Sequence, residues 1–226
     1  MSKAIYHITP FTLLDYPDKT ACIVWFAGCN MRCRYCYNID IVKGKGNLEY
    51  DKAIAFINSR KNLLDGVVLS GGECMLHCKI DGFIKEIKKL NFLLKIDTNG
   101  SNPRMLQYLI KECLVDYVAL DFKSLADQFF FITKSDLFTK FEKTLDILIG
   151  SSIPFEVRTT VHSKLINIEY LKKMLQYLET KKYAGTYYIQ NFLNDTPTLA
   201  AIENDYQKIK PDDLSSNSIK IIIRNE

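Results

Sequence analysis

Short apolar runs alternate with helix-periodic segments along most of this 226-residue chain, and this alternation restricts the folds that it can adopt. The runs are rich in β-branched and aromatic residues and end at glycine or polar residues, which is typical of buried strands; they cover residues 21–27, 66–70, 92–97, 115–120, 155–161 and 186–190. Amphipathic periodicity predicts helices between them, over residues 51–59, 78–89, 102–112, 136–149 and 167–180. Repeated strand–helix units predict a parallel sheet with right-handed crossovers. We therefore expect an α/β fold that closes into a partial (β/α)6 barrel of the TIM type.

The length and composition are those of a single globular domain. A chain of 226 residues can bury a complete core, and 47% hydrophobic with 25% charged residues is close to the average of soluble globular proteins. We expect one domain over residues 1–226, with its core at about residues 20–192. The C-terminal extension, residues 193–226, is expected to wrap the barrel before a last strand at residues 219–223.

Charge and hydropathy exclude several classes of function. The net charge is only +4, and lysine and arginine are interspersed with acidic residues, so no basic stripe points to a nucleic acid. The amino terminus lacks a secretory signal, and no apolar stretch is long enough to span a bilayer, so we expect no membrane partner and a cytoplasmic location. Seven cysteines, an odd number without a secretory signal, argue against a disulfide framework and leave thiols free to hold a metal.

Three cysteines lie in one short loop directly after the first predicted strand. Cys29, Cys33 and Cys36 are close enough in the chain to wrap three corners of one metal centre. A four-iron, four-sulfur cluster usually has four cysteine ligands, so three leave one iron open to another molecule. The alternative is a zinc site completed by His77 or Cys74, but zinc sites more often use two Cys-x-x-Cys pairs.

Polar clusters follow the next three predicted strands as well. They are Gly71-Gly72-Glu73, Thr98-Asn99-Gly100 and Asp121-Phe122-Lys123. Ligands gather at the carboxyl ends of parallel strands, so one site at this rim would explain all of the clusters. The glycines permit close backbone approach to a ligand, and Glu73 can accept a hydrogen bond from a cationic amine.

Further polar residues are candidates for the same site. Thr98, Asn99 and Asp121 can hold a ribose, a carboxylate or a monovalent cation. The planar guanidinium of Arg158 can contact a carboxylate or a hydroxyl. Gln190 is a similar candidate from the sixth predicted strand. The competing interpretation for this set is a salt bridge or a satisfied polar group at the end of a barrel.

The remaining cysteines are interpreted as structural. Cys74 and Cys78 could share a helix face beside His77 and hold a second metal, but cysteine is commonly a small buried hydrophobe and no fourth ligand lies nearby. Cys22 and Cys113 lie within apolar runs and are expected in the core.

The cysteine loop, Gly28-Cys29-Asn-Met-Arg-Cys33-Arg-Tyr35-Cys36, resembles the signature of the radical S-adenosylmethionine (radical SAM) superfamily. The resemblance implies one 4Fe-4S cluster held by Cys29, Cys33 and Cys36, with Tyr35 beside the cofactor. It also implies that the amino and carboxylate groups of S-adenosylmethionine chelate the open iron, and that an electron from the reduced cluster splits the sulfonium to give a 5'-deoxyadenosyl radical. Gly71, Gly72 and Glu73 resemble the motif that binds the methionine amino group, although Cys74 replaces the usual proline.

Longer blocks resemble the activating enzymes of glycyl radical proteins, above all those of anaerobic ribonucleotide reductase. The resemblance runs over about residues 5–192 and includes Phe11-Thr-Leu-Leu-Asp-Tyr-Pro17 and Asp97-Thr-Asn-Gly100. It implies removal of an α-hydrogen from a glycine of a partner, here the large subunit of anaerobic ribonucleotide reductase, and an electron donor of the flavodoxin or ferredoxin type. Asp121 and Lys123 match cofactor-binding positions of related activases, whereas Gln190 stands near the place of a histidine in some relatives.

Two other readings of the sequence remain open. One is a radical enzyme that acts on a small molecule or peptide, such as the family that builds the deazapurine ring, and the other is a metal-stabilised interaction module without enzymatic activity. Some activases carry a ferredoxin-like insert after the cysteine loop, but residues 38–65 of this chain contain no cysteine, which favours a single cluster. The glycine that the activase resemblance predicts after Thr133 is absent, and this departure bears on the contacts with the partner.

Overall fold

A computed structural model describes residues 3–225, and its contacts divide the chain into two compact units. Unit 1 comprises the residues through Asn30, with Asn38–Thr98 and Asn102–Ala119. Unit 2 comprises Met31–Tyr37, Asn99–Ser101 and the residues from Leu120 onward. The chain therefore passes between the units several times, and the predicted single domain stays a prediction.

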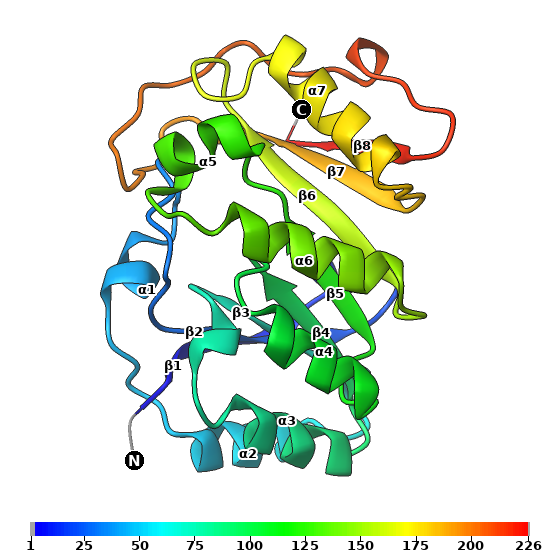
Figure 1. Ribbon diagram of the computed structural model, residues 1–226. Coiled ribbons are helices and arrows are strands. Elements are labelled where there is room, and N and C mark those ends of the chain that lie inside the picture. The colour runs from blue at the N-terminus through cyan, green and yellow to red at the C-terminus, as the bar shows by residue number, and fades with distance from the viewer. Residues whose placement is uncertain (1–2, 226) are drawn as a thin grey trace. The chain divides into compact units, whose positions relative to one another are not determined.

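Unit 1 is built on a mainly parallel sheet. It holds β1 (Ile5–Thr12), β2 (Ala21–Phe26), β3 (Gly66–Gly71), β4 (Leu93–Thr98) and the first residues of β5 (Tyr117–Asp121) (Figure 1). β1 pairs with β2 in antiparallel fashion, whereas β2, β3 and β4 are parallel neighbours. The carboxyl ends of β2, β3 and β4 therefore lie at one edge of this sheet.

The helices of unit 1 are α1 (Ile39–Lys43), α2 (Tyr50–Ser59), α3 (Ile80–Lys89) and α4 (Pro103–Lys111), with the short 3-10 helix η1 (Cys74–Leu76) after β3. α3 buries one stripe of side chains, Ile80, Phe83, Ile84 and Ile87, as its amphipathic sequence predicts. A separate cluster of buried side chains is formed by Tyr16, Ala21, Ile23 and Val68, with Trp25, Leu93 and Tyr117 packed against it. Apolar burial of this extent holds the sheet of unit 1 together.

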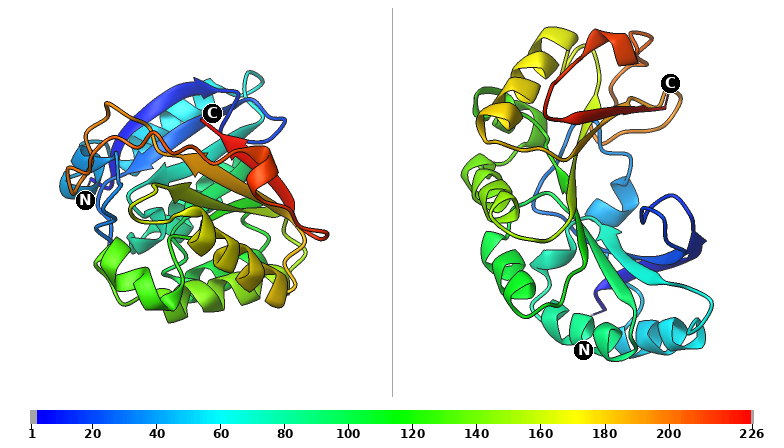
Figure 2. Two further views of the ribbon diagram at one scale, coloured as in Figure 1. Left: turned by 90° about the horizontal axis from the view of Figure 1, so that it is seen from above. Right: turned by 90° about the vertical axis from the view of Figure 1, so that its right-hand side faces the viewer.

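Unit 2 contains a second group of parallel strands. β6 (Phe155–Val161) pairs with β7 (Thr186–Asn191), and β7 pairs with β8 (Lys220–Arg224). Its helices are α5 (Ala126–Thr133), α6 (Phe138–Ile149) and α7 (Ile168–Thr180), with the 3-10 helix η2 (Pro211–Asp213). Figure 2 shows α7 lying along one face of these strands, where its buried residues Leu171, Met174, Leu175 and Leu178 pack.

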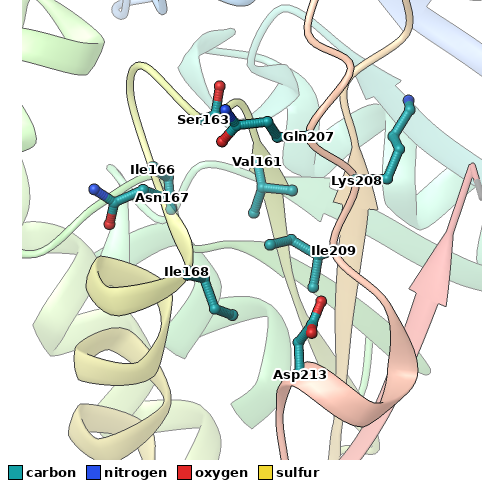
Figure 3. A pocket seen from close by; sticks show the side chains of 9 residues that line it. All are labelled: Val161, Ser163, Ile166, Asn167, Ile168, Gln207, Lys208, Ile209 and Asp213. Atoms are coloured by element: carbon teal, nitrogen blue, oxygen red, sulfur yellow. The ribbon is translucent and has the colours of Figure 1, made fainter.

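The segment between β7 and β8 is tied to the loop that joins β6 to α7. Asp205 accepts hydrogen bonds from the backbone and hydroxyl of Ser163, and His162 Nε2 lies 2.9 Å from the carbonyl oxygen of Glu203. A cavity of about 230 Å³ lies beside these contacts (Figure 3); it is lined by Val161, Ser163, Ile166, Asn167, Ile168, Gln207, Lys208, Ile209 and Asp213. No cysteine lines this cavity, so it is separate from the three-cysteine loop.

The predicted α/β class is confirmed, and each expected strand and helix has a counterpart in the structure. The sequence reading missed β1, α1 and α5. β1 mixes buried and exposed residues irregularly and contains Pro10, so its pattern is weaker than that of a buried strand. Within residues 3–225, the structure has no helix of the length and apolar character needed to cross a membrane.

Candidate active site

The cysteine loop begins in unit 1, where β2 ends at Phe26. Gly28 turns the chain with a φ of +83°, a left-handed conformation that favours glycine. Its N–H donates to the carbonyl of Ile41 at 2.8 Å, and its carbonyl accepts from the N–H of Glu73 at 2.9 Å. Cys29 follows directly and is partly exposed. Both backbone polar groups of Gly28 are therefore hydrogen-bonded to neighbouring segments, which fixes the backbone at the point where Cys29 begins.

Gly71 and Gly72 are required by close contacts between backbones. A Cβ atom on Gly71, whose φ is +119°, would lie 2.4 Å from the backbone nitrogen and oxygen of Phe26. A Cβ atom on Gly72 would lie 1.9 Å from the carbonyl oxygen of Gly28. Gly71 thus lies close to the end of β2 and Gly72 close to the start of the cysteine loop, and this brings Glu73 beside that loop.

Glu73 and Thr98 form a buried pair at the ends of β3 and β4. The Thr98 hydroxyl lies 3.0 and 3.1 Å from the two carboxylate oxygens of Glu73, and the Met75 N–H donates to the same carboxylate at 3.3 Å. Glu73 is 1% exposed and Thr98 2%. A buried carboxylate oriented in this way can accept hydrogen bonds from a cationic amine.

A second carboxylate lies one strand position before Thr98. Asp97 accepts from the Lys95 ammonium at 2.6 Å and from the Ser70 hydroxyl at 3.1 Å. Lys95 is 1% exposed, so this is a buried ion pair on the parallel strands of unit 1. Its charges compensate one another, as burial of charge requires.

The rest of the cysteine loop belongs to unit 2, which holds it by its backbone. The N–H groups of Arg32 and Arg34 donate to the carbonyls of Thr133 and Ile132, the last residues of α5, at 2.7 and 3.0 Å. The N–H of Cys36 donates to the Cys33 carbonyl at 3.0 Å. On the other side, the Leu199 and Ala200 N–H groups donate to the carbonyls of Cys36 and Arg34 at 3.0 and 3.1 Å. Cys33 is buried and Cys36 is partly exposed.

Tyr35 carries a buried polar atom that lacks a partner. Within the part of the chain that the structure describes, its hydroxyl oxygen makes no hydrogen bond. Burial raises the pKa of this phenol, which therefore stays neutral, while the nearby Lys123 ammonium acts in the opposite direction. That ammonium lies 5.8 Å from the centre of the Tyr35 ring. A buried hydroxyl of this kind is available to a bound molecule.

Asp121 links two cations at the end of β5. It accepts from Lys123 at 3.1 Å and from Arg158 Nε at 3.0 Å. Burial opposes the charge on Lys123, but the Asp121 carboxylate, through its charge and its hydrogen bond, holds the pKa of Lys123 well above the usual value. Lys123 is therefore protonated across the physiological range of pH and can contact a carboxylate or a ribose hydroxyl.

Asn99 and Gln190 complete the predicted set in unit 2. Asn99 is 5% exposed, and its side-chain oxygen accepts the Ser101 N–H at 2.9 Å, which forms an Asx turn. Gln190 is partly buried on β7, where it pairs with Thr160 of β6 and Arg224 of β8. In all, unit 1 holds Cys29, Gly71, Gly72, Glu73 and Thr98, and unit 2 holds Cys33, Tyr35, Cys36, Asn99, Asp121, Lys123, Arg158 and Gln190.

Sequence reasoning missed a polar residue on the same strands. The Arg224 guanidinium lies 3.8 Å from the centre of the Tyr188 ring, and strand register pairs Arg158 with Tyr188. Side chains two positions apart on a strand share a face, so Tyr188 and Gln190 lie on one face of β7. The alternation of buried and partly buried residues along β7 was a signal that could have identified Tyr188, whereas β8 has no such alternation to identify Arg224.

The structure corrects the prediction for one of the other cysteines, Cys113. Cys22 is buried as predicted, and burial raises the pKa of its thiol to about 11. Cys113, which we expected in the core, is exposed, because it follows α4 in a left-handed turn with φ +54°. Cys74 is buried and Cys78 is exposed, so the two thiols do not share an environment. His77 Nε2 instead lies 3.0 Å from the carbonyl oxygen of Ala27.

The donor set suits an iron–sulfur cluster and a polar cofactor. Three thiols in one loop match the usual ligand type of such clusters, and the unpartnered Tyr35 hydroxyl is open to a bound molecule. Within residues 3–225, no three His, Cys, Asp or Glu side chains are gathered closely enough to hold a single metal ion. In a cluster, by contrast, each thiolate binds a separate iron atom, so the ligands need not converge on one point.

Comparison with known families identifies the chemistry. The family model of the radical SAM superfamily matches residues 23–178, more than half of the chain, including all three cysteines of the loop. The chain belongs to the radical SAM superfamily. Enzymes of this superfamily use a 4Fe-4S cluster and S-adenosylmethionine, so the predictions of enzyme class and cofactors are confirmed.

Among curated proteins, this radical SAM enzyme is similar to activating enzymes of glycyl radical proteins. It is 30% identical over 202 residues to MJ1227 of Methanocaldococcus jannaschii, whose name assigns it provisionally to the glycyl-radical enzyme activating enzymes; the match covers 85% of this chain and 81% of that protein. It is 30% identical to the pyruvate formate-lyase-activating enzyme of Clostridium pasteurianum over 54% of this chain and 53% of the relative. The predicted family of activating enzymes is therefore confirmed.

Solved structures of radical SAM enzymes share the fold. SuiB of Streptococcus suis bound to S-adenosylmethionine has a TM-score of 0.65 and 13% identity, with 90% of this chain and 52% of SuiB covered. The enzyme anSMEcpe with bound AdoMet has a TM-score of 0.61 and 18% identity, with 74% and 49% covered. The chain thus spans about half the length of these proteins. At such low identity the likeness concerns the fold alone, and it confirms the α/β fold of the radical SAM type.

Proposed function

We propose that this enzyme cleaves S-adenosylmethionine reductively and removes an α-hydrogen from a glycine residue of a partner glycyl radical enzyme. The observation that carries the proposal is the similarity to a glycyl-radical enzyme activating enzyme over 85% of the chain. The radical SAM family model, which matches residues 23–178, includes the segment with the three-cysteine loop.

Cys29, Cys33 and Cys36 are the proposed ligands of the cluster. When bound, the cluster would supply the electron for reductive cleavage of the bond between sulfur and C5' of S-adenosylmethionine. The loop's contribution is to hold Cys33 and Cys36 in fixed positions through backbone hydrogen bonds to α5 and to residues 199–200. With three thiolate ligands, one iron of a bound cluster would have no protein ligand and would be open to the methionine amino and carboxylate groups.

The two units supply different groups to the cofactor in this proposal. From unit 1, the buried Glu73 carboxylate, oriented by Thr98, accepts hydrogen bonds from the methionine amino group, while Gly71 and Gly72 hold its loop against the cysteine loop. From unit 2, Tyr35 and Asn99 contact the nucleoside. The cationic side chains of Lys123 and Arg158, both paired with Asp121, contact the carboxylate or the ribose of S-adenosylmethionine. Gln190 makes the remaining polar contact with the cofactor.

The hydrogen transfer moves the unpaired electron from the cofactor fragment to the partner protein. The 5'-deoxyadenosyl radical takes one hydrogen atom from the glycine α-carbon and becomes 5'-deoxyadenosine, and the unpaired electron remains on the partner's backbone. The protein's own task is to exclude water and other hydrogen donors from this step.

We propose the large subunit of anaerobic ribonucleotide reductase as the partner. The support is the resemblance of residues 11–17 and 97–103, together with the other motif blocks, to the activating proteins of that reductase. The electron donor is of the flavodoxin or ferredoxin type, and the place of action is the cytoplasm.

Anaerobic reconstitution tests the proposal directly. The reduced enzyme, S-adenosylmethionine and the candidate reductase subunit should give a carbon-centred doublet in electron paramagnetic resonance, with release of 5'-deoxyadenosine. Cys29→Ala, Cys33→Ala and Cys36→Ala should each lose cluster absorbance and both products, whereas Cys78→Ala and Cys113→Ala, which change exposed thiols, should keep them. Cleavage of the cofactor without a doublet on any glycyl radical protein would contradict the partner class. A protein that binds stoichiometric zinc and cleaves no cofactor would contradict the enzyme itself.

A further inference from the structure

Two adjacent phenylalanines on α5 are exposed. Phe130 is 63% exposed and Phe131 45%, whereas the next residue on the helix, Ile132, is fully buried. Large aromatic side chains are usually buried, and neighbouring exposed ones are typical of surfaces that bind another protein.

Two cations flank this pair. The Arg34 guanidinium lies 4.4 Å from the centre of the Phe131 ring. The Lys134 ammonium lies 5.9 Å from the Phe130 ring and 5.6 Å from the Phe131 ring. We call Arg34, Phe130, Phe131 and Lys134 the aromatic–cation patch. The carboxylates nearest in the sequence are Asp127, on the same helix, and Asp136. With the exposed Arg32 of the cysteine loop, three cations stand against these two carboxylates, which leaves a net positive charge around the patch.

Lys134 occupies a position that favours glycine. It ends α5 in the left-handed region, with φ +54° and ψ +34°, and its N–H donates to the Phe130 carbonyl at 2.9 Å. This is the place where the activase resemblance predicts a glycine after Thr133. A residue with a Cβ atom pays a steric cost in this conformation. Lys134 therefore places its ammonium at a backbone position where glycine would be more stable.

The patch is joined to the cysteine loop by hydrogen bonds within unit 2. Arg34 lies between Cys33 and Cys36 in the sequence, and its N–H donates to the Ile132 carbonyl. Arg32, also exposed, donates in the same way to Thr133. A protein bound to the patch would therefore lie directly against the loop that carries two of the proposed cluster ligands.

We infer that the aromatic–cation patch docks an acidic one-electron carrier protein of the flavodoxin or ferredoxin class. The inference rests on the proposed function, because the cluster must receive an electron before the cofactor is cleaved. The carrier's reduced flavin or iron–sulfur centre loses one electron and the cluster gains it; that electron then passes to the sulfonium as methionine leaves. Exposed rings supply the contact area, and the cations select an acidic surface and speed its approach.

Binding of a purified acidic flavodoxin tests the inference without any turnover. We expect Lys134→Glu and Phe130→Ser each to raise the Kd, measured by isothermal titration calorimetry at low salt, by about tenfold. Lys173→Glu is the matched control, since it makes the same charge change at an exposed position of α7 and should leave the Kd within about twofold of the wild-type value. Lys134→Gly removes the cation while relaxing the backbone, so it excludes misfolding as the cause of weaker binding. A Kd that is unchanged in all three patch variants would overturn the inference.

Two routes of reduction separate this inference from the proposed function. With dithionite as reductant, Lys134→Gly and Phe130→Ser should release 5'-deoxyadenosine at the wild-type rate, because the carrier is bypassed. With reduced flavodoxin at limiting concentration, both should be slower by about tenfold. If the wild-type protein releases none even with dithionite, the proposed function fails, while the Kd still decides the docking site. If the variants weaken binding of the glycyl radical partner and not of flavodoxin, the patch belongs to that partner and the inference is overturned.

Discussion

The hydroxyl of Thr98 bridges the two carboxylate oxygens of Glu73, at 3.0 and 3.1 Å. A hydroxyl has one hydrogen to donate, so the two oxygens share it in one bifurcated hydrogen bond, and this contact limits rotation of the carboxylate. Because Thr98 ends β4 and Glu73 lies two residues beyond the end of β3, its parallel neighbour, the sheet helps to set the direction in which Glu73 faces. Cofactor binding should therefore depend on Thr98 as well as on the acidic residue that the sequence motif identifies.

Thr98→Val keeps the shape of the side chain but removes the hydroxyl. A hydrogen bond to a charged group contributes about 1.5–3 kcal/mol, so we expect the Kd for S-adenosylmethionine to rise by about tenfold or more. Thr98→Ser, which keeps the hydroxyl, should bind nearly as well as the wild type. The measurement is equilibrium binding of S-adenosylmethionine to the reconstituted, oxidised enzyme. Equal affinity of the valine and serine variants would show that the bridge does not orient Glu73 for the cofactor.

Gly72→Ala should disrupt the contact between the loop after β3 and the cysteine loop. The added Cβ would lie 1.9 Å from the Gly28 carbonyl oxygen, which is backbone and cannot rotate away. We expect a loss of about 1–3 kcal/mol in the free energy of unfolding, together with poor incorporation of iron. Gly82→Ala is the control, because a Cβ on this residue of α3 meets nothing within 4 Å. It should stabilise the protein by up to about 1 kcal/mol through helix propensity. Urea unfolding followed by circular dichroism measures both, and equal stability of the two variants would contradict the close contact.

The sequence predicted the fold well where its signals are local. Buried parallel strands leave continuous apolar runs, and β2 and β3, buried over most of their length, were located within a residue or two. α5 was missed because its Phe129-Phe130-Phe131 run is apolar on all sides and lacks the helical alternation. The structure explains that run, since Phe129 is buried whereas Phe130 and Phe131 are exposed.

Site residues were predictable from short motifs, but their contacts were not. The motif identified Gly72 as a close-approach position, yet only the coordinates show that the approach is to Gly28. Likewise, Asp121 was a candidate from its place after a strand, whereas its pairing with Arg158 joins residues 37 positions apart in the chain. Such contacts depend on how strands align in the sheet, which residue spacing alone does not encode. Cys113 was misplaced for a related reason, because an apolar neighbourhood does not reveal a left-handed helix end.

Cys113→Gly should stabilise the protein. Cys113 has a φ of +54° after α4, and the Leu114 N–H donates to the Leu109 carbonyl at 2.9 Å, which is the Schellman arrangement that favours glycine. Relief of the steric cost should raise the free energy of unfolding by about 0.5–1 kcal/mol. Lys182→Gly, after α7, should give a similar gain, since Lys182 has a φ of +63° and the Tyr183 N–H donates to the Leu178 carbonyl. Cys78→Gly changes an exposed thiol at a position without positive φ, and a gain there of the same size would contradict this explanation.

Asp205 should make the anchoring of the C-terminal segment dependent on pH. Burial raises the pKa of this carboxyl, but hydrogen bonds from Ser163 and Gln207 outweigh it and hold the pKa below the usual 3.8. A depressed folded-state pKa means that the ionised group stabilises the fold above the unfolded pKa and that this stability is lost as pH falls through the folded one.

We therefore expect Asp205→Asn to lower the free energy of unfolding by about 1–2 kcal/mol at pH 7. The difference from wild type should shrink as the pH falls below about 4, because the wild-type carboxyl then becomes neutral as well. Asp212→Asn, at an exposed position of the same segment, should change stability little at either pH. Urea unfolding of the three proteins between pH 7 and pH 3 measures these differences. A deficit in Asp205→Asn that stays constant with pH would mean that shape and neutral hydrogen bonding, rather than charge, hold this segment against the loop after β6.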